Sequence, residues 1–333
     1  EQAASLKRIG ECKGRQDLFV RQTPEVLETL KQVALIESSE SSNRLEGILA
    51  PHDRVEALVR KSTNPRNRPE QEIAGYRDAL SLIHESAPHM PFTENVILQL
   101  HATIHRYLPM DGGKWKRNDN AIVEKNPDGT VGRVRFAPVR ATATPDAMAA
   151  LVKLYREALE IHNQEPLVAA PAAILDFLCI HPFSDGNGRT ARLLTLLLLY
   201  HFDYQVGRYI SLERIFEESK ESYYETLEAS SQGWHEGKHD LRPWLTYFWG
   251  ALIKAYREFE ERVGSIKTGR GSKSGQIRQA VERRRAPFAI SDIEGDCPGI
   301  SRDMVRVVLR RLRDEGLILL QGKGRGAKWL RKQ

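Results

Sequence analysis

Twelve consecutive residues carry most of the side chains of this chain that could do chemistry: His181-Pro182-Phe183-Ser184-Asp185-Gly186-Asn187-Gly188-Arg189-Thr190-Ala191-Arg192. An apolar run from Leu193 to Tyr200 follows directly and predicts a buried helix. A glycine-rich loop that opens a helix presents backbone N–H groups at the positive end of the helix dipole, which together suit a phosphate. This segment, called the motif loop below, is therefore predicted to bind a phosphate.

The side chains of the motif loop add metal-binding and proton-transfer chemistry. Arg189 and Arg192 supply fork-shaped, charged donors for phosphate oxygens, and Asp185 could hold a divalent cation between those oxygens. The imidazole of His181, with an ordinary pKa of about 6.5, suits a general base. The sequence has neither the Gly-Lys-Ser/Thr of a P-loop nor a Gly-x-Gly-x-x-Gly after a strand. A simple turn would not require these side chains together, so the segment predicts a nucleotide site with a base beside it.

The motif loop resembles the signature of the Fic family, His-Pro-Phe-x-Asp-Gly-Asn-Gly-Arg-x-x-Arg, and matches all nine specified positions. Fic proteins are helical enzymes that transfer nucleotide monophosphates to hydroxyl groups of other proteins. The similarity extends over roughly residues 33–263. It implies a protein adenylyltransferase (AMPylator) with a mainly α fold, in which a helical Fic core carries one β-hairpin flap.

The resemblance also implies a role for each position of the motif loop. His181 would take the proton from a Ser, Thr or Tyr hydroxyl of a target protein, whose oxygen attacks the α-phosphate of ATP and expels pyrophosphate. Asp185 would bind Mg²⁺ between the α- and β-phosphate oxygens, and Arg192 would reach the γ-phosphate. The remaining phosphate-binding positions are Gly186, Asn187, Gly188, Arg189 and Thr190.

Residues outside the motif loop complete the implied nucleotide pocket. Two tyrosines and two flap residues belong to it: Tyr223, Tyr224, Ile122 and Val123. Ser231 also belongs to it and stands where the family often has an asparagine that lines the adenine pocket. The flap is entered through residues 113–116, where Lys116 replaces the usual arginine. Because of Ser231, transfer of UMP or phosphocholine and removal of AMP from a target stay open as alternatives.

A second match lies near the N-terminus. The segment from Ser42 to Gly47 fits the Fic inhibitory pattern Ser/Thr-x-x-x-Glu-Gly/Asn. In the family this glutamate, here Glu46, pairs with the second arginine of the motif, here Arg192. A carboxylate at that arginine removes the anchor of the γ-phosphate and leaves the α-phosphate poorly oriented for attack. The alternative is an ordinary helix end with Glu46 in solvent and Gly47 at the C′ position. We expect the isolated protein to be largely autoinhibited.

Hydrophobic periodicity predicts the elements that position these residues. Apolar residues three and four apart indicate helices over 24–45, 70–85, 93–108, 145–163, 167–180, 190–202, 215–230 and 243–263. The polar stretch 61–69 contains two prolines and predicts a loop. Two β-favouring runs, 121–123 and 131–139, flank Asn126-Pro127-Asp128-Gly129 and predict the hairpin.

The C-terminal part has a different pattern. After a Gly/Ser/Lys-rich stretch, helices are predicted over 277–285, 290–296 and 301–313, and β runs 317–320 and 328–331 flank a glycine-rich segment. Three helices followed by two strands indicate a small winged helix-turn-helix domain. We therefore expect an N-terminal helical region carrying the inhibitory motif (1–60), a Fic core (61–265), a linker (266–276) and a winged-helix domain (277–333).

Charge is unevenly distributed between these parts. Residues 266–333 carry 17 Lys/Arg against 7 Asp/Glu, whereas residues 1–265 carry 33 against 37. The basic tail favours DNA as a partner, with residues 301–313 as recognition helix and Lys323 and Arg325 near phosphates. Protein contact or dimerisation through the same domain is the alternative. A DNA-binding regulator controlled by self-modification is a further function that the sequence permits.

Composition limits the setting in which the protein works. The chain is 41% hydrophobic and 28% charged, as in ordinary soluble proteins, and no apolar run is long enough to span a bilayer. The three cysteines, Cys12, Cys179 and Cys297, indicate a reducing compartment rather than a disulfide framework. We expect a cytoplasmic protein without a membrane partner and consider a homodimer possible. His101 and His105 lack a third metal ligand and are assigned no role.

Overall fold

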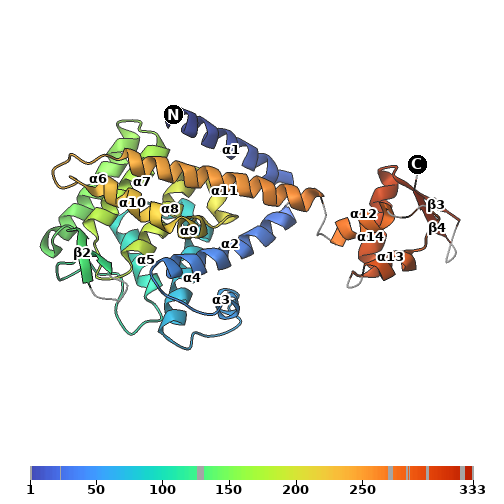
Figure 1. Cartoon of the computed structure of the whole chain (residues 1–333), viewed down its shortest axis with the longest axis horizontal. Helices are drawn as coiled ribbons and strands as arrows, with labels where there is room; N and C mark the ends of the chain where they lie inside the picture. Colours follow the sequence, from blue (N-terminus) through green and yellow to red (C-terminus); the bar gives the residue numbers. More distant parts are fainter. Residues whose placement is uncertain are drawn as a thin grey trace. The chain divides into compact units, whose positions relative to one another are not determined.

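The computed structural model describes residues 2–22, 24–125, 131–268, 273–282, 284, 286–297, 300–322 and 327–331. The chain divides into two compact units, Glu1–Phe259 and Glu260–Gln333. The fold is mainly helical, as predicted, with two small antiparallel sheets (Figure 1).

Two of the expected domain boundaries differ from the structure. Residues 1–60 are not separate from the core, because their helices pack inside the first unit. The expected linker 266–276 is largely helical, since α11 (Arg242–Thr268) and α12 (Lys273–Glu282) leave only 269–272, which lie outside the described residues. Gly275 inside α12 costs about 1 kcal/mol relative to alanine. Burial of the apolar residues that follow it in α12 offsets this cost.

The N-terminal part of the first unit consists of helices only. They are α1 (Gln2–Gln22), α2 (Pro24–Leu45), α3 (His52–Val59) and α4 (Arg68–Ser86). The bounds of α2 agree with the prediction, whereas α1, with few apolar positions, was not singled out by the sequence pattern. Asn67 caps α4 by accepting a hydrogen bond from the backbone N–H of Glu70. Helix α2 packs against α4 and α9, which places its C-terminal end in the interior of the unit.

The predicted hairpin is present between two helices. The elements here are η1 (Ala87–His89), α5 (Glu94–Ile104), β1 (Ile122–Lys125), β2 (Val131–Phe136), η2 (Ala141–Ala143) and α6 (Thr144–Glu160). Strands β1 and β2 pair antiparallel, with Ile122 opposite Phe136, and the predicted turn at 126–129 lies outside the described residues. Strand β2 ends before the expected Val139, because Pro138 has no N–H to donate to a ladder.

Helix α8 is the centre of the first unit. The elements around it are α7 (Pro166–Ile180), α8 (Asn187–His201), η3 (Gln205–Arg208), α9 (Leu212–Glu218) and α10 (Lys220–Ser231). All residues of α8 from Arg189 to Tyr200 are buried, as the apolar run predicts. The helix begins three residues earlier than expected, at Asn187. The single helix expected over 215–230 is broken at Ser219, whose side chain donates to the backbone of Ile215.

The second unit has the predicted order of elements. Helices α12, α13 (Ile290–Asp296) and α14 (Arg302–Asp314) precede strands β3 (Ile318–Gln321) and β4 (Lys328–Arg331). Ser301 caps α14, and the backbones of Phe288 and Trp329 exchange hydrogen bonds of 2.9 and 2.8 Å. One apolar cluster forms the core of this unit. Lys323 and Arg325, which were expected near phosphates, lie outside the described residues. Among the helices that the structure describes, none is both long and apolar enough to cross a membrane.

Candidate active site

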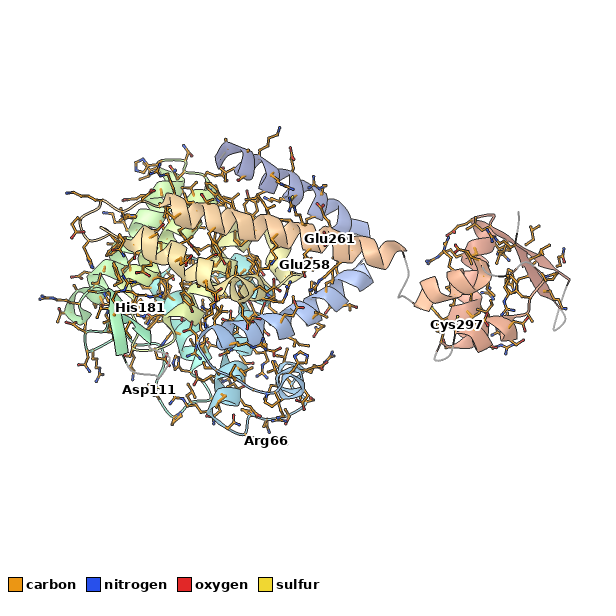
Figure 2. The ribbon with its side chains drawn as sticks, in the orientation of Figure 1. Arg66, Asp111, His181, Glu258, Glu261 and Cys297 are labelled. Carbon is orange, nitrogen blue, oxygen red and sulfur yellow. The ribbon has the colours of Figure 1, made fainter. Side chains whose placement is uncertain are left out.

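A cavity of about 390 Å³ lies between the hairpin, the C-terminal end of α7, the start of α8, and α10. Figure 2 shows His181 in the first unit, on the side where the hairpin lies. Most of the predicted site residues line this cavity: Glu46, Ile122, Val123, His181, Asp185, Gly186, Asn187, Gly188, Arg192, Tyr223, Tyr224 and Ser231. Four others, Ser42, Gly47, Arg189 and Thr190, do not line it.

The backbone holds His181 in a conformation that is rare for a residue with a side chain. It caps α7 with φ 50° and ψ 60°, in the left-handed region. Its Nδ1 lies 3.2 Å from the carbonyl oxygen of Leu178, so Nδ1 carries the proton and Nε2 keeps its lone pair. Burial lowers the pKa of His181 to about 4. The imidazole is therefore neutral at physiological pH and able to accept a proton.

The motif loop makes a tight turn into α8. Gly186 is the N-cap residue with φ 78°, which glycine adopts without strain. The side chain of Asn187 bridges the backbone of Phe183, accepting from its N–H at 2.9 Å and donating to its carbonyl at 2.7 Å. The amide of Asn187 thus braces the loop, and its expected contact with phosphates stays a prediction. The first N–H groups of α8 have no hydrogen-bond partner within the helix. They can therefore donate hydrogen bonds to an anion at this site.

Arg189 does not line the cavity, but its guanidinium lies between a buried carboxylate and Asp185 at the cavity. Its Nη1 donates to Glu72 of α4 at 2.7 Å, and both side chains are almost fully buried. The role expected for Arg189 at the phosphates stays a prediction, since Glu72 takes its Nη1 while its Nη2 lies 3.5 Å from Oδ2 of Asp185, which lines the cavity. Thr190 is also buried away from the cavity, and its hydroxyl has no partner among the described residues.

Replacing Arg189 with alanine is expected to lower the free energy of unfolding by about 3–5 kcal/mol, because the carboxylate of Glu72 stays buried and keeps only the exposed Arg68 as a partner. Arg68→Ala is the control: Arg68 contacts the same carboxylate at 3.0 Å, but its side chain is 66% exposed, so its loss is expected to cost less than about 1 kcal/mol. Urea unfolding followed by tryptophan fluorescence measures both, since four of the five tryptophans lie in the first unit. Equal losses in the two variants would contradict the assignment.

Arg192 is bound by the segment that matches the inhibitory pattern. Its Nη2 lies 2.7 Å from Oε1 of Glu46 and 2.9 Å from the carbonyl oxygen of Ser42, and its Nε donates to the Ser42 hydroxyl at 2.8 Å. Gly47 follows with φ 79° and ends the turn after α2. A Cβ at Gly188 would lie 2.2 Å from Oε1 of Glu46. The carboxylate of Glu46 therefore occupies the anion position at the first turn of α8.

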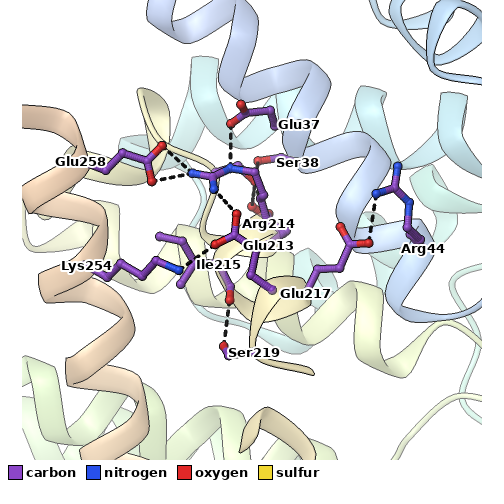
Figure 3. A network of polar contacts seen from close by, with 12 residues as sticks. Glu37, Ser38, Arg44, Glu213, Arg214, Ile215, Glu217, Ser219, Lys254 and Glu258 are labelled. Atoms are coloured by element: carbon purple, nitrogen blue, oxygen red, sulfur yellow. Dashed lines mark hydrogen bonds and ion pairs between the residues drawn. The ribbon is translucent and has the colours of Figure 1, made fainter. Parts of the chain in front are cut away.

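A network of ion pairs links α2 to two other helices (Figure 3). Arg214 of α9 contacts Glu37 of α2 at 3.2 Å and Glu258 of α11 at 2.6 Å. Arg44 of α2 contacts Glu217 of α9 at 3.1 Å. A single surface pair stabilises little, but a network that joins three helices limits how α2 can move. Because Arg44 lies two residues before Glu46, the network also positions the carboxylate that contacts Arg192.

His101 has a role that the sequence analysis missed. Its Nδ1 accepts a hydrogen bond from the N–H of Gly113 at 2.8 Å, so its Nε2 donates to the carbonyl of Asp185 at 3.0 Å. Its ring stacks on Phe183 with centroids 3.6 Å apart, and burial lowers its pKa to about 3. His101 is thus a neutral residue that positions the motif loop from α5. The sequence feature that could have indicated this role was the pair of histidines four residues apart on a predicted helix.

Lys116, at the position where the family has arginine, ties the base of the hairpin to the motif loop. Its backbone N–H donates to the carbonyl of Pro182 at 2.8 Å. Its buried Nζ donates to the carbonyl of Ile180 at 3.1 Å and to Asn120 at 2.7 Å. The sequence analysis also missed Glu228 of α10, which lines the cavity and pairs with Arg133 of β2 at 2.6 Å. These contacts hold the hairpin over the cavity.

Residues 91–199 match the model of the Fic/DOC family. Two curated relatives, named protein adenylyltransferase Fic, come from Drosophila ananassae and Drosophila melanogaster and are 28% and 27% identical over 181 residues. These alignments cover 53% of this chain and 31% of each relative, so the chain matches about a third of the relatives' length.

Solved structures share the fold. A Fic family protein from Desulfovibrio desulfuricans has a TM-score of 0.66 at 20% identity, covering 99% of this chain and 95% of that one. Fic-1 from C. elegans has a TM-score of 0.61 at 19% identity, covering 80% and 74%. The motif loop up to Arg192 lies inside the matched residues, whereas Glu46 lies outside them. Residues 91–199 of this chain therefore match the Fic/DOC family, and the fold is that of solved Fic proteins.

Proposed function

We propose that the chain is a protein adenylyltransferase that moves AMP from ATP to a Ser, Thr or Tyr hydroxyl of a target protein. The observation that carries the proposal is one cavity in which a neutral imidazole, the N-terminus of a buried helix and a buried arginine lie together. The names of the curated relatives support the same reaction.

The reaction follows from what each group can do. Nε2 of His181 accepts the proton of the target hydroxyl, and the freed oxygen attacks the α-phosphorus of ATP. The bond from that phosphorus to the bridging oxygen breaks, pyrophosphate leaves, and AMP remains on the target. The N–H groups at the start of α8 stabilise the charge on the α-phosphate. The guanidinium of Arg192 is the anchor for the γ-phosphate once Glu46 no longer occupies it.

Asp185 fits a Mg²⁺ site of the kind completed by substrate phosphates. Its side chain is half exposed at the cavity, and Oδ1 accepts from the N–H of Gly186 at 2.7 Å. In the part of the chain that the structure describes, no three His, Cys, Asp or Glu side chains are grouped to hold a metal. One carboxylate with phosphate oxygens and water is a usual Mg²⁺ environment. The ion would supply charge neutralisation at the phosphates.

The target is proposed to align along the hairpin. Among the residues that the structure describes, strand β1 pairs only with β2, so its other edge can accept an extended segment of a target by strand addition. Lys116 and Glu228 hold the two ends of this hairpin near His181 and α10. A target hydroxyl presented along β1 would then enter the cavity beside the base.

Incubating the Glu46→Gly variant with ATP, UTP, GTP and CTP, each labelled at the α-phosphate, in a lysate tests the proposal. Transfer from ATP to protein, with a modified hydroxyl mapped by mass spectrometry, is the expected result. Ser231, the residue expected in the adenine pocket, donates a hydrogen bond from its hydroxyl to the backbone carbonyl of Glu228 at 2.8 Å. This hydroxyl is therefore already hydrogen-bonded within α10. Transfer only from another nucleotide, or only removal of AMP from a modified protein, would favour the alternative activities.

The imidazole of His181 is expected to remain neutral from pH 8 down to about pH 5, because burial lowers its pKa to about 4. Protonation then begins only as the pH falls towards 4. Proton NMR of the ring Cε1–H in the free protein measures this, with the signal assigned by its loss in His181→Ala. Free histidine in the same tube, with a pKa of about 6.5, is the reference. A His181 signal that moves together with the reference would contradict the burial argument.

A further inference from the structure

One face of α14 in the second unit is a stripe of arginines. Arg302, Arg306, Arg310 and Arg313 are exposed, whereas Val305, Val308, Leu309 and Leu312 are buried in the core of the unit. With 3.6 residues per turn, the four arginines fall within an arc of about 80° and along about 17 Å of the helix. By the same geometry the buried residues are centred about 110° around the helix axis from the arginines, on an adjacent side, and the stripe itself is exposed.

The contacts of these arginines leave them available to another anion. Arg306 pairs with Asp303 at 3.2 Å and Arg313 with Asp314 at 2.8 Å, both of them exposed surface pairs. Such pairs contribute about 0–1 kcal/mol and exchange easily with a phosphate. The side chain of Arg310 has no hydrogen-bond or ion-pair partner among the described residues.

Other features of the unit favour a nucleic acid groove. Arg302 is tied to Glu294 of α13 at 3.1 Å, which fixes the start of α14 against the preceding helix. Val307 lies beside the stripe with 51% of its surface exposed. An exposed valine among arginines is unfavourable in water, but it suits the methyl group of thymine in a major groove, where arginine reads guanine. The order of three helices and two strands, with β4 bridged to Phe288, is that of a winged helix-turn-helix.

We propose that the second unit binds duplex DNA by placing α14 in the major groove, with Arg306 and Arg310 in contact with it. The charge of the C-terminal residues supports this partner over a protein, since 17 Lys/Arg stand against 7 Asp/Glu in residues 266–333. The exposed Leu317, Leu319 and Leu320 near β3 are the surface that a protein partner would use instead. This activity does not depend on nucleotide transfer, so the two proposals can fail separately.

Fluorescence anisotropy of a labelled 20-base-pair duplex, titrated with the full chain without nucleotide, tests the proposal. We expect a Kd of about 10⁻⁴–10⁻⁶ M or tighter that weakens steeply between 50 and 200 mM KCl. The double variant Arg306→Ala/Arg310→Ala is expected to bind at least about tenfold more weakly and to reduce the slope of log K against log salt by about 2.

The control is the double variant Arg60→Ala/Arg242→Ala, which removes two exposed arginines of the first unit that also have surface pairs. It is expected to bind DNA like the unmodified chain. Duplex RNA of the same sequence is expected to bind more weakly, because the major groove of A-form RNA is too narrow for a helix. The proposal is overturned by three results: no DNA binding at 50 mM KCl, equal losses in the two double variants, or equal affinity for RNA.

Discussion

Replacing His181 is expected to lower the rate of AMP transfer by about 10²- to 10⁴-fold, because its neutral imidazole is the proposed acceptor of the proton of the target hydroxyl. The affinity for ATP is expected to change little, since the imidazole faces the attacking oxygen rather than the phosphates. Two variants separate chemistry from folding. His181→Ala removes the base, and His181→Asn removes it while keeping a residue that tolerates the left-handed backbone at φ 50°.

Transfer by these variants is measured in the Glu46→Gly background, so that the starting rate is high, and ATP affinity is measured by calorimetry. His89→Ala is the control, because His89 is exposed and does not line the cavity. A rate within a few fold of the parent in both His181 variants would refute His181 as the base. Loss of both transfer and ATP binding in His181→Asn would instead show that residue 181 mainly shapes the loop.

Removing the carboxylate of Glu46 is expected to raise kcat/KM for ATP about 10- to 100-fold. The physical reason is that the carboxylate occupies both the guanidinium of Arg192, at 2.7 Å, and the anion position beside Gly188. A hydrogen bond to a charged group contributes about 1.5–3 kcal/mol, and about 1.4 kcal/mol corresponds to a factor of ten in rate. Because one third of the Glu46 side chain is exposed, solvent screening favours the lower part of this range.

Two substitutions separate charge from bulk. Glu46→Gln keeps the shape and removes the charge, so it is expected to activate less than Glu46→Gly, which also clears the anion position. Glu28→Gly is the control, since Glu28 is an exposed residue of α2, the helix that ends just before Glu46, and its replacement removes a carboxylate that does not contact Arg192. If Glu46→Gly and Glu28→Gly transfer AMP at the rate of the unmodified chain, Glu46 does not inhibit this site.

Much of the local structure was predictable because it depends on residues close together in sequence. The period of apolar residues located α2, α7 and the buried part of α8, and β-favouring runs located the hairpin. Errors arose where a single side chain outweighs the local pattern. Ser219 ends α9 inside a continuous helical pattern, and Pro138 ends β2 before the apolar run does.

The roles of the two arginines in the motif loop show the limit of the sequence. Both are placed by α8, yet Arg189 is bound by Glu72, 117 residues earlier in the chain, and Arg192 by Glu46, 146 residues earlier. Their spacing of three places them about 60° apart around the helix axis, so they are neighbours on its surface. Which face meets the cavity depends on how α8 packs against α2 and α4.

The sequence by itself determined the chemistry that the motif loop offers: a base, an anion-binding turn, a carboxylate for a cation and a buried helix behind them. These properties follow from residue type and short-range geometry. Only the tertiary structure decided that His101 and Lys116 hold the loop, that Asn187 braces it, that Arg189 pairs with Glu72, and that Glu46 pairs with Arg192. The physical reason is that such contacts join residues far apart in the chain, and packing of the whole unit is what brings them within hydrogen-bond distance.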